Sequence, residues 1–333
     1  MEEVANELNH GGLVISLDLK LNWSVHDTFR YGRYSKNMNG VRQALPKILA
    51  LFEQYGIHAT WATVGLLFAE SKAEMAHYLR GIPVKYDNMR YAAHMQLAKV
   101  GENEEQDFLH FGKSLIERIK STPHQEIGSH TFSHFYCLEK GQTEADFRSD
   151  LHATAMICEE LTGPMKSIVF PRNQINKAYF GACREVGLIC YRGNENHPVY
   201  STNTGHTIRV KKWLDSYMNI TGNHLVTMEE MQKDTLINVH SSAFLRPYCG
   251  PLRFLEGLKM KRIKEAMHEA ATTKTFYHLW WHPHNFSKKL GKNLAILEEI
   301  LQYYQELSQK YNFQSYAMYE VAELCHQLSK QKK

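Results

Sequence analysis

Stretches typical of β-strands alternate with stretches typical of helices along almost the whole of the 333-residue chain. Residues 13–21 and 58–64 are short runs of apolar and β-branched side chains, as expected of strands. Between them, residues 41–55 place apolar side chains at helical spacing, and Gly56 follows where a helix would end. Parallel strands need a long crossover, which a helix usually provides. The alternation therefore predicts βα units and a parallel sheet.

The same alternation continues towards the C-terminus. Further strands are expected at 125–128, 168–173, 187–192 and 275–282. Further helices are expected at 103–120, 143–161, 177–186, 251–272, 293–309 and 316–327. Roughly seven such units in one chain predict the α/β class and a single-domain, distorted (β/α)7-type barrel rather than an open sheet.

Composition and charge narrow the classes of protein that the chain can belong to. Hydrophobic residues make up 43% and charged residues 22%, a balance typical of a globular protein and not of a disordered one. The formal net charge of +4 is small for this length. The Lys-rich stretch after Leu328 is expected to be a solvated tail. Nucleic acid is therefore not an expected partner.

The cysteines and the N-terminus bear on localisation. None of the 6 cysteines forms a Cys-x-x-Cys pair, so scattered thiols in a reducing compartment are expected. The first residues are acidic and no apolar signal region follows them. No run approaches the roughly 20 apolar residues that a membrane-spanning helix needs. We expect a cytoplasmic protein with no integral membrane segment, and nothing in the sequence indicates its oligomeric state.

Two histidines four residues apart give the clearest chemical signal. His130 and His134 lie in Ser129-His-Thr-Phe-Ser-His134, directly after the strand expected at 125–128. This spacing suits a pair of metal ligands, and neutral imidazoles suit zinc and similar divalent ions. Two loop histidines bonded to the backbone would give the same spacing. The motif therefore indicates a metal site only if further polar residues lie near it.

Polar groups lie at or near the ends of three other expected strands. Asp18 lies in the first strand, Arg172 ends the strand at 168–173, and His282 ends the strand at 275–282. In a parallel barrel the carboxyl ends of the strands meet at one face, where active sites form. Asp18 suits a third metal ligand, His282 suits proton transfer, and Arg172 suits the binding of a carboxylate. Each residue also has a purely structural explanation. Asp18 would then be a turn carboxylate, His282 a buried core histidine and Arg172 a surface arginine.

These motifs, in this order, resemble the polysaccharide deacetylase family (carbohydrate esterase family 4, the NodB-type deacetylases). Ser129-His-Thr-Phe-Ser-His134 is similar to the family's His-(Ser/Thr)-x-x-His metal motif, and Ile15-Ser-Leu-Asp-Leu-Lys20 stands in the place of its Thr-Phe-Asp-Asp motif. Phe170-Pro-Arg-Asn173 matches its arginine motif and Leu279-Trp-Trp-His282 its last strand motif. The likeness is greatest to a cytoplasmic branch linked to surface-polysaccharide biosynthesis.

The resemblance implies a barrel over residues 12–285, with C-terminal helices in 286–333 packed on it. It implies a divalent metal, usually zinc, held by Asp18, His130 and His134, that activates water against an N-acetyl carbonyl. An aspartate acts as base, the histidine matching His282 protonates the leaving amine, and the arginine matching Arg172 orients the base. The substrate would be an N-acetylated sugar or glycan.

One departure from the family affects the expected site. The family has two adjacent aspartates, whereas here Leu19 and Lys20 follow Asp18. Asp27 and Glu126 are candidate substitutes for the missing carboxylate. Two alternatives to a sugar N-deacetylase therefore stay open: another C–N hydrolase, such as an amino-sugar deformylase, and a non-catalytic barrel that binds a glycan or a protein partner.

Overall fold

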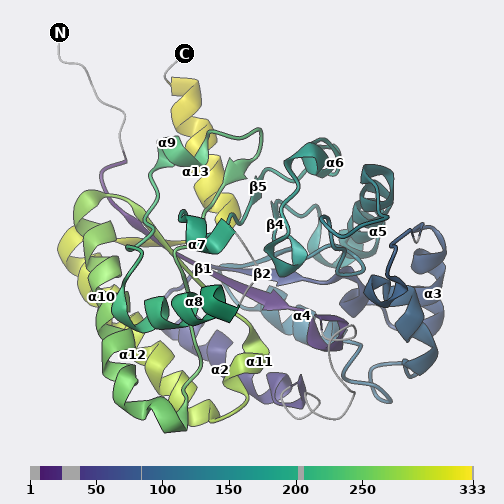
Figure 1. Ribbon diagram of the computed structural model, residues 1–333, viewed down its shortest axis with the longest axis horizontal. Helices are drawn as coiled ribbons and strands as arrows, with labels where there is room; N and C mark the ends of the chain where they lie inside the picture. The colour runs from purple at the N-terminus through teal and green to yellow at the C-terminus, as the bar shows by residue number, and fades with distance from the viewer. Residues whose placement is uncertain (1–7, 25–37, 84, 202–205, 332–333) are drawn as a thin grey trace.

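The computed structural model describes residues 8–24, 38–83, 85–201 and 206–331. Within these ranges nine strands, all paired in parallel, form one sheet that crosses the middle of the molecule (Figure 1). The strands are β1 Gly12–Leu19, β2 Ala59–Thr63, β3 Gln125–Ser129, β4 Ser167–Ile168, β5 Cys190–Tyr191, β6 Ile237–Asn238, β7 Ala243–Phe244, β8 Phe276–Trp281 and β9 Gln314–Tyr316.

The order of the strands shows that the sheet is curled. Along the sheet the strands follow the order β6-β5-β4-β3-β2-β1-β8-β7. The two strands at its ends, β6 and β7, are consecutive in sequence and are joined only by residues 239–242. The two edges must therefore approach each other, as in an incompletely closed barrel. The prediction of a single-domain α/β protein with a distorted (β/α) barrel is confirmed.

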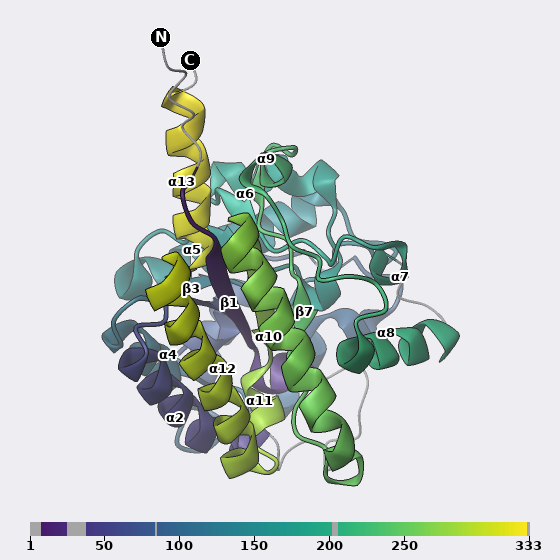
Figure 2. The ribbon, with the colours of Figure 1, turned by 90° about the vertical axis from the view of Figure 1, so that its left-hand side faces the viewer.

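Helices cover the outside of the sheet. α2, α10 and α12 lie side by side over the outer face of β1 (Figure 2). The helices are α2 Val41–Gln54, α3 Lys72–Arg80, α4 Lys113–Ser121, α5 Glu144–Thr162, α6 Phe180–Glu185, α7 Pro198–Ser201, α8 His206–Met218, α9 Met228–Met231, α10 Glu256–Thr273, α11 Pro283–Phe286, α12 Leu290–Tyr311 and α13 Met318–Gln331. Within the described residues, no helix has both the length and the apolar character that crossing a membrane requires.

Strand β1 is buried along its whole length and has two different faces. Leu13, Leu17 and Leu19 belong to the main apolar core. On the alternate face, Ser16 and Asp18 are buried polar residues. A buried carboxylate is strongly unfavourable unless it is paired. The charge of Asp18 therefore requires a partner at the carboxyl end of this strand.

The C-terminal part of the chain contributes to the sheet itself. β9 pairs with β1 at Gly12–Val14, whereas β2 pairs with β1 from Ile15 onward. Since β8 occupies the other side of β1 from Gly12 to Leu17, β9 must lie on the same side as β2. Residues 286–333 thus supply a short strand as well as α12 and α13.

The helix expected at 103–120 is shorter than the sequence pattern predicts. α4 begins at Lys113, and turns precede it. The carboxylate of Asp107 accepts hydrogen bonds from the backbone N–H groups of Gly101 and Leu109, and its Oδ2 lies 2.7 Å from His110 Nδ1. Aspartate side chains that bond nearby backbone groups compete with helix formation. An apolar pattern alone does not reveal this competition.

Candidate active site

Asp18 on β1 is paired with Arg192, which directly follows β5. Arg192 Nη1 donates to Asp18 Oδ1 at 2.8 Å and Nη2 to Oδ2 at 3.3 Å. The Arg192 side chain is 1% exposed and that of Asp18 4%. Burial disfavours the charged form of Asp18, but Arg192 and the neighbouring histidines outweigh it, so the pKa of Asp18 lies well below its usual range. Asp18 is therefore a buried, permanently charged carboxylate.

His282 and Lys20 complete the surroundings of this carboxylate. His282 Nδ1 lies 3.3 Å from Asp18 Oδ2, and Lys20 Nζ lies 3.7 Å from the same oxygen. Burial, helped by the charge of Lys20, lowers the pKa of His282 to about 4. The imidazole is thus neutral at neutral pH. Its buried Nδ1 has no hydrogen-bond partner among the described residues, and a neutral imidazole that carries its proton on Nδ1 would present Nε2 as a proton acceptor.

His130 and His134 lie in a tight turn after β3. Thr131 and His134 have left-handed backbone conformations, with φ of 61° and 59°. The Asp150 carboxylate of α5 holds this turn by accepting from the backbone N–H groups of Phe132 and Ser133 at 2.6 Å and 3.0 Å. The buried turn brings the rings of His130 and His134 within 5.0 Å of each other, centroid to centroid.

The three ligands predicted from the sequence do not fit a metal ion as a set. His130 suits the role: its Nδ1 lies 2.7 Å from the Val169 carbonyl oxygen, and its buried Nε2 has no hydrogen-bond partner among the described residues. Asp18 does not, because Arg192 takes both of its oxygens. Across the described residues, no group of three or more His, Cys, Asp and Glu side chains is arranged to hold a metal ion.

Among the described residues, Arg172 makes no ion pair with Asp18. Its guanidinium lies over the ring of Tyr136, 4.4 Å from the centroid, and its Nη1 is 4.0 Å from Glu139 Oε1. The contact with the carboxylate that was expected of Arg172 is made by Arg192 instead. The signal for Arg192 was present in the sequence, because it ends the strand expected at 187–192, just as His282 ends its own expected strand.

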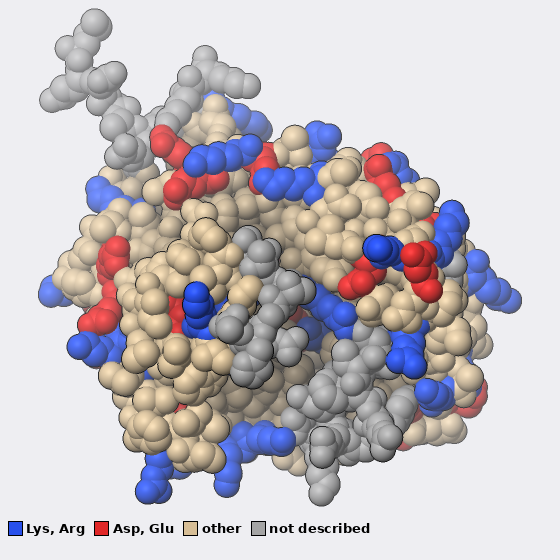
Figure 3. Space-filling view, in the orientation of Figure 1, with Lys and Arg blue, Asp and Glu red and all other residues tan. Residues whose placement is uncertain are grey.

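A pocket of about 320 Å³ opens beside His282. Its lining includes His282, Trp280 and Asn173, and Arg192 lies directly behind Trp280, 4.1 Å from the ring centroid. Lys and Arg surface is visible in the hollow near the middle of the face drawn in Figure 3. A larger hollow of about 620 Å³ runs along the outer side of α10 and α12 and contains none of these groups. The pocket at His282 is therefore the candidate substrate pocket.

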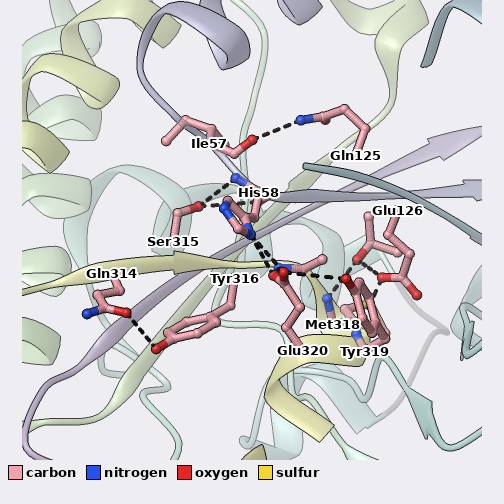
Figure 4. Close-up of polar contacts among 12 residues, drawn as sticks. Ile57, His58, Gln125, Glu126, Gln314, Ser315, Tyr316, Met318, Tyr319 and Glu320 are labelled. Atoms are coloured by element: carbon pink, nitrogen blue, oxygen red, sulfur yellow. Dashed lines mark hydrogen bonds and ion pairs between the residues drawn. The ribbon is translucent and has the colours of Figure 1, made fainter. Parts of the chain in front are cut away.

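Glu126, one of the two candidate substitute carboxylates, makes its contacts away from Asp18. Glu126 is buried near the start of β3, where it accepts hydrogen bonds from Thr60 Oγ1 and Ser167 Oγ, each at 2.5 Å, and from the backbone N–H of Tyr319 (Figure 4). Burial raises the pKa of Glu126 to about 7. Glu126 thus belongs to the contact between the sheet and α13. Asp27 lies outside the described residues.

The protein is a (β/α) barrel, and a charged carboxylate, an imidazole and a pocket lie together at the carboxyl ends of its strands. This arrangement is typical of an enzyme active site. The model of the family described as "Polysaccharide deacetylase" matches residues 28–190. This match covers just under half of the chain and agrees with the resemblance that its motifs predicted. No curated protein matches the sequence.

Similar solved structures have low sequence identity to this chain. A protein from Mycobacterium smegmatis described as a candidate polysaccharide deacetylase matches with a TM-score of 0.59 and 15% identity, over 97% of this chain and 92% of that chain. A carbohydrate esterase family 4 pseudoenzyme from Bacillus anthracis matches with a TM-score of 0.44 and 12% identity, over 94% and 66%. The peptidoglycan deacetylase PdaC from Bacillus subtilis matches with a TM-score of 0.44 and 11% identity, over 97% and 96%.

Proposed function

We propose that the chain is a hydrolase that removes the N-acetyl group from an N-acetylated sugar in surface-glycan biosynthesis. The match of residues 28–190 to the polysaccharide deacetylase family model supports hydrolysis of an acetylated sugar. The pocket of about 320 Å³ beside His282 supports a small or partly enclosed substrate. All six cysteines are free thiols, which supports a cytoplasmic location.

The position of His282 is the observation that carries this proposal. One of its ring nitrogens, Nδ1, faces Asp18 at 3.3 Å, and the residue also lines the pocket. Asp18 does not line the pocket, and its side chain is 4% exposed against 19% for His282. His282 is thus the group that meets the substrate, while Asp18 orients the imidazole.

The proposed reaction transfers one proton through His282. Water attacks the acetyl carbonyl carbon, and His282 Nε2 takes the proton that the water loses. Asp18 stabilises the imidazolium that forms, and Arg192 keeps Asp18 charged and in place. When the C–N bond breaks, the imidazolium returns its proton to the leaving nitrogen. The products are acetate and the free amino sugar.

Metal dependence is a separate part of the proposal. The divalent metal expected from the sequence, zinc above all, would bind at His130 and His134. A bound metal would polarise the carbonyl and lower the pKa of water. Since Asp18 is held by Arg192, no step proposed above depends on the metal. Zinc binding stays a prediction.

The proposal is tested by measuring acetate release from N-acetylglucosamine and from its nucleotide-linked form, with and without added zinc. We expect His282→Gln to lose about 10²- to 10⁴-fold in rate. The matched control is His268→Gln, on the outer side of α10 near Tyr311. Unchanged acetate release in His282→Gln would remove His282 from its role. Release of formate from N-formyl sugars, with no acetate release, would show that the protein is an amino-sugar deformylase instead.

A further inference from the structure

The pocket beside His282 has a cationic part that the proposed reaction does not use. Lys212 of α8, Arg246 after β7 and Arg262 of α10 all line it. Among the described lining residues, Glu195 is the single carboxylate. Three cationic side chains therefore converge on the space in which the substrate would lie.

The two arginines of this cationic part differ in how their charges are balanced. Arg262 Nη2 donates to Asp215 Oδ2 at 2.8 Å, so its charge is paired within the protein. Arg246 donates from Nε to Ser216 Oγ at 2.6 Å and from Nη2 to the Lys212 carbonyl oxygen at 3.4 Å. Both acceptors are neutral. Within the described part of the chain, no carboxylate lies within ion-pair distance of Arg246.

The surroundings of Arg246 also leave its positive charge poorly stabilised. Burial lowers the pKa of Arg246, and the charge of Arg262 adds to the effect. Burial also raises the pKa of Glu195, whose Oε1 accepts from Trp280 Nε1 at 3.3 Å. Glu195 is bound into the wall of the pocket, where it interacts with the charges of Arg192 and Lys212 and is not within ion-pair distance of Arg246. A half-buried cation whose hydrogen-bond acceptors are neutral is stabilised when an anion binds to it.

We propose that Lys212, Arg246 and Arg262 bind a phosphate group of the substrate, so that the sugar is a phosphorylated or diphosphate-linked one. The guanidinium group binds phosphate through two parallel N–H···O bonds, and phosphate offers enough oxygens for several cations at once. The identity of the sugar rests on the proposed function. The anion site rests only on the charges and contacts of the pocket.

The test is calorimetric titration of the full chain with inorganic phosphate, inorganic pyrophosphate and malonate at constant ionic strength. We expect pyrophosphate to bind more tightly than malonate. In Arg246→Gln the dissociation constant for pyrophosphate should rise by about tenfold or more, as expected when one charge-assisted contact is lost. Arg246→Lys, which keeps the charge, should show a smaller rise. Arg184→Gln, the same change at an exposed position on α6, should match wild type.

Each outcome of the titration decides the proposal. Equal pyrophosphate affinity in wild type and in a folded Arg246→Gln variant would overturn it, as would malonate binding at least as tight as pyrophosphate. If Arg246→Gln does not fold, Lys212→Gln supplies the same comparison, and unchanged affinity there counts against the site. Because binding needs no turnover, pyrophosphate binding without deacetylation would reject the proposed function alone. Deacetylation without such binding would reject the anion site alone.

Discussion

Asp18 and Arg192 form a two-point ion pair in the interior of the protein, although 174 positions separate them in sequence. Their side chains are 4% and 1% exposed. The pair connects the carboxyl end of β1 with that of β5, and His282 Nδ1 lies 3.3 Å from the same carboxylate. We therefore expect both the stability and the proposed activity of the protein to depend on this contact.

Removing one partner of this pair should destabilise the fold strongly. In Arg192→Met, Asp18 would keep a buried charge without its guanidinium, which costs about 3–5 kcal/mol. Urea unfolding monitored by circular dichroism measures this loss. In the double variant Asp18→Asn, Arg192→Met both charges are gone, so the loss should be smaller than in Arg192→Met alone. A double variant at least as unstable as Arg192→Met would show that the charge of Asp18 is not the cause.

The two arginines can be ranked by their effect on turnover. We expect Arg192→Lys to lower kcat by about 100-fold, because lysine cannot supply the two parallel N–H groups that hold Asp18. Arg172→Lys should leave kcat within about tenfold of wild type, since Arg172 lies over Tyr136 and makes no ion pair with Asp18. Steady-state kinetics of acetate release from one N-acetylated sugar measure kcat for both variants. The opposite ranking would restore Arg172 to the role that the sequence predicted.

The fold was predictable from the sequence because its signals are local. Apolar side chains at strand and helix spacing located β1, β2, β3, β8 and most of the helices. The short strands β6, β7 and β9 were missed, because two or three residues give no periodic pattern. Their pairing depends on tertiary contacts with β5, β8 and β1, which no local pattern encodes.

The sequence indicated which residues belong to the site better than it indicated which of them contact each other. Asp18, His130 and His282 were selected because each lies at or near the end of an expected strand. Which side chains meet depends on the relative positions of strands far apart in sequence. Arg172 and Arg192 both follow such strands, and only the three-dimensional arrangement shows that Arg192 reaches Asp18. Residue type and spacing could not distinguish the two.

Zinc titration will decide whether Asp18 is a ligand. Calorimetry should show that His130→Ala and His134→Ala each weaken zinc binding by about tenfold or more, because each removes an imidazole donor. Asp18→Asn should change zinc affinity by less than about threefold, since Arg192 already takes both carboxylate oxygens. His268→Ala serves as the control. A loss in Asp18→Asn equal to that in His130→Ala would establish the three-ligand set predicted from the sequence.

Glu126 should make the protein less stable as the pH rises. Its pKa is about 7 in the fold, against 4.5 for an unperturbed glutamate. Between these values the folded chain keeps a proton that the unfolded chain has lost. The free energy of unfolding is therefore unaffected below about pH 4.5, falls as the pH rises towards 7, and is lower by about 3 kcal/mol above it.

Replacing Glu126 by glutamine separates this carboxylate from other titrating groups. Glu126→Gln keeps an oxygen for the hydroxyl group of Thr60 or Ser167 but cannot ionise. Its free energy of unfolding should fall much less between pH 5 and pH 8 than that of wild type, with the remaining fall due to Asp150, whose pKa burial raises to about 6. Glu323→Gln, an exposed change on α13, should follow wild type. Equal slopes in wild type and Glu126→Gln would mean that Glu126 is already ionised in the folded protein at pH 5, with its charge stabilised by the hydroxyl groups around it.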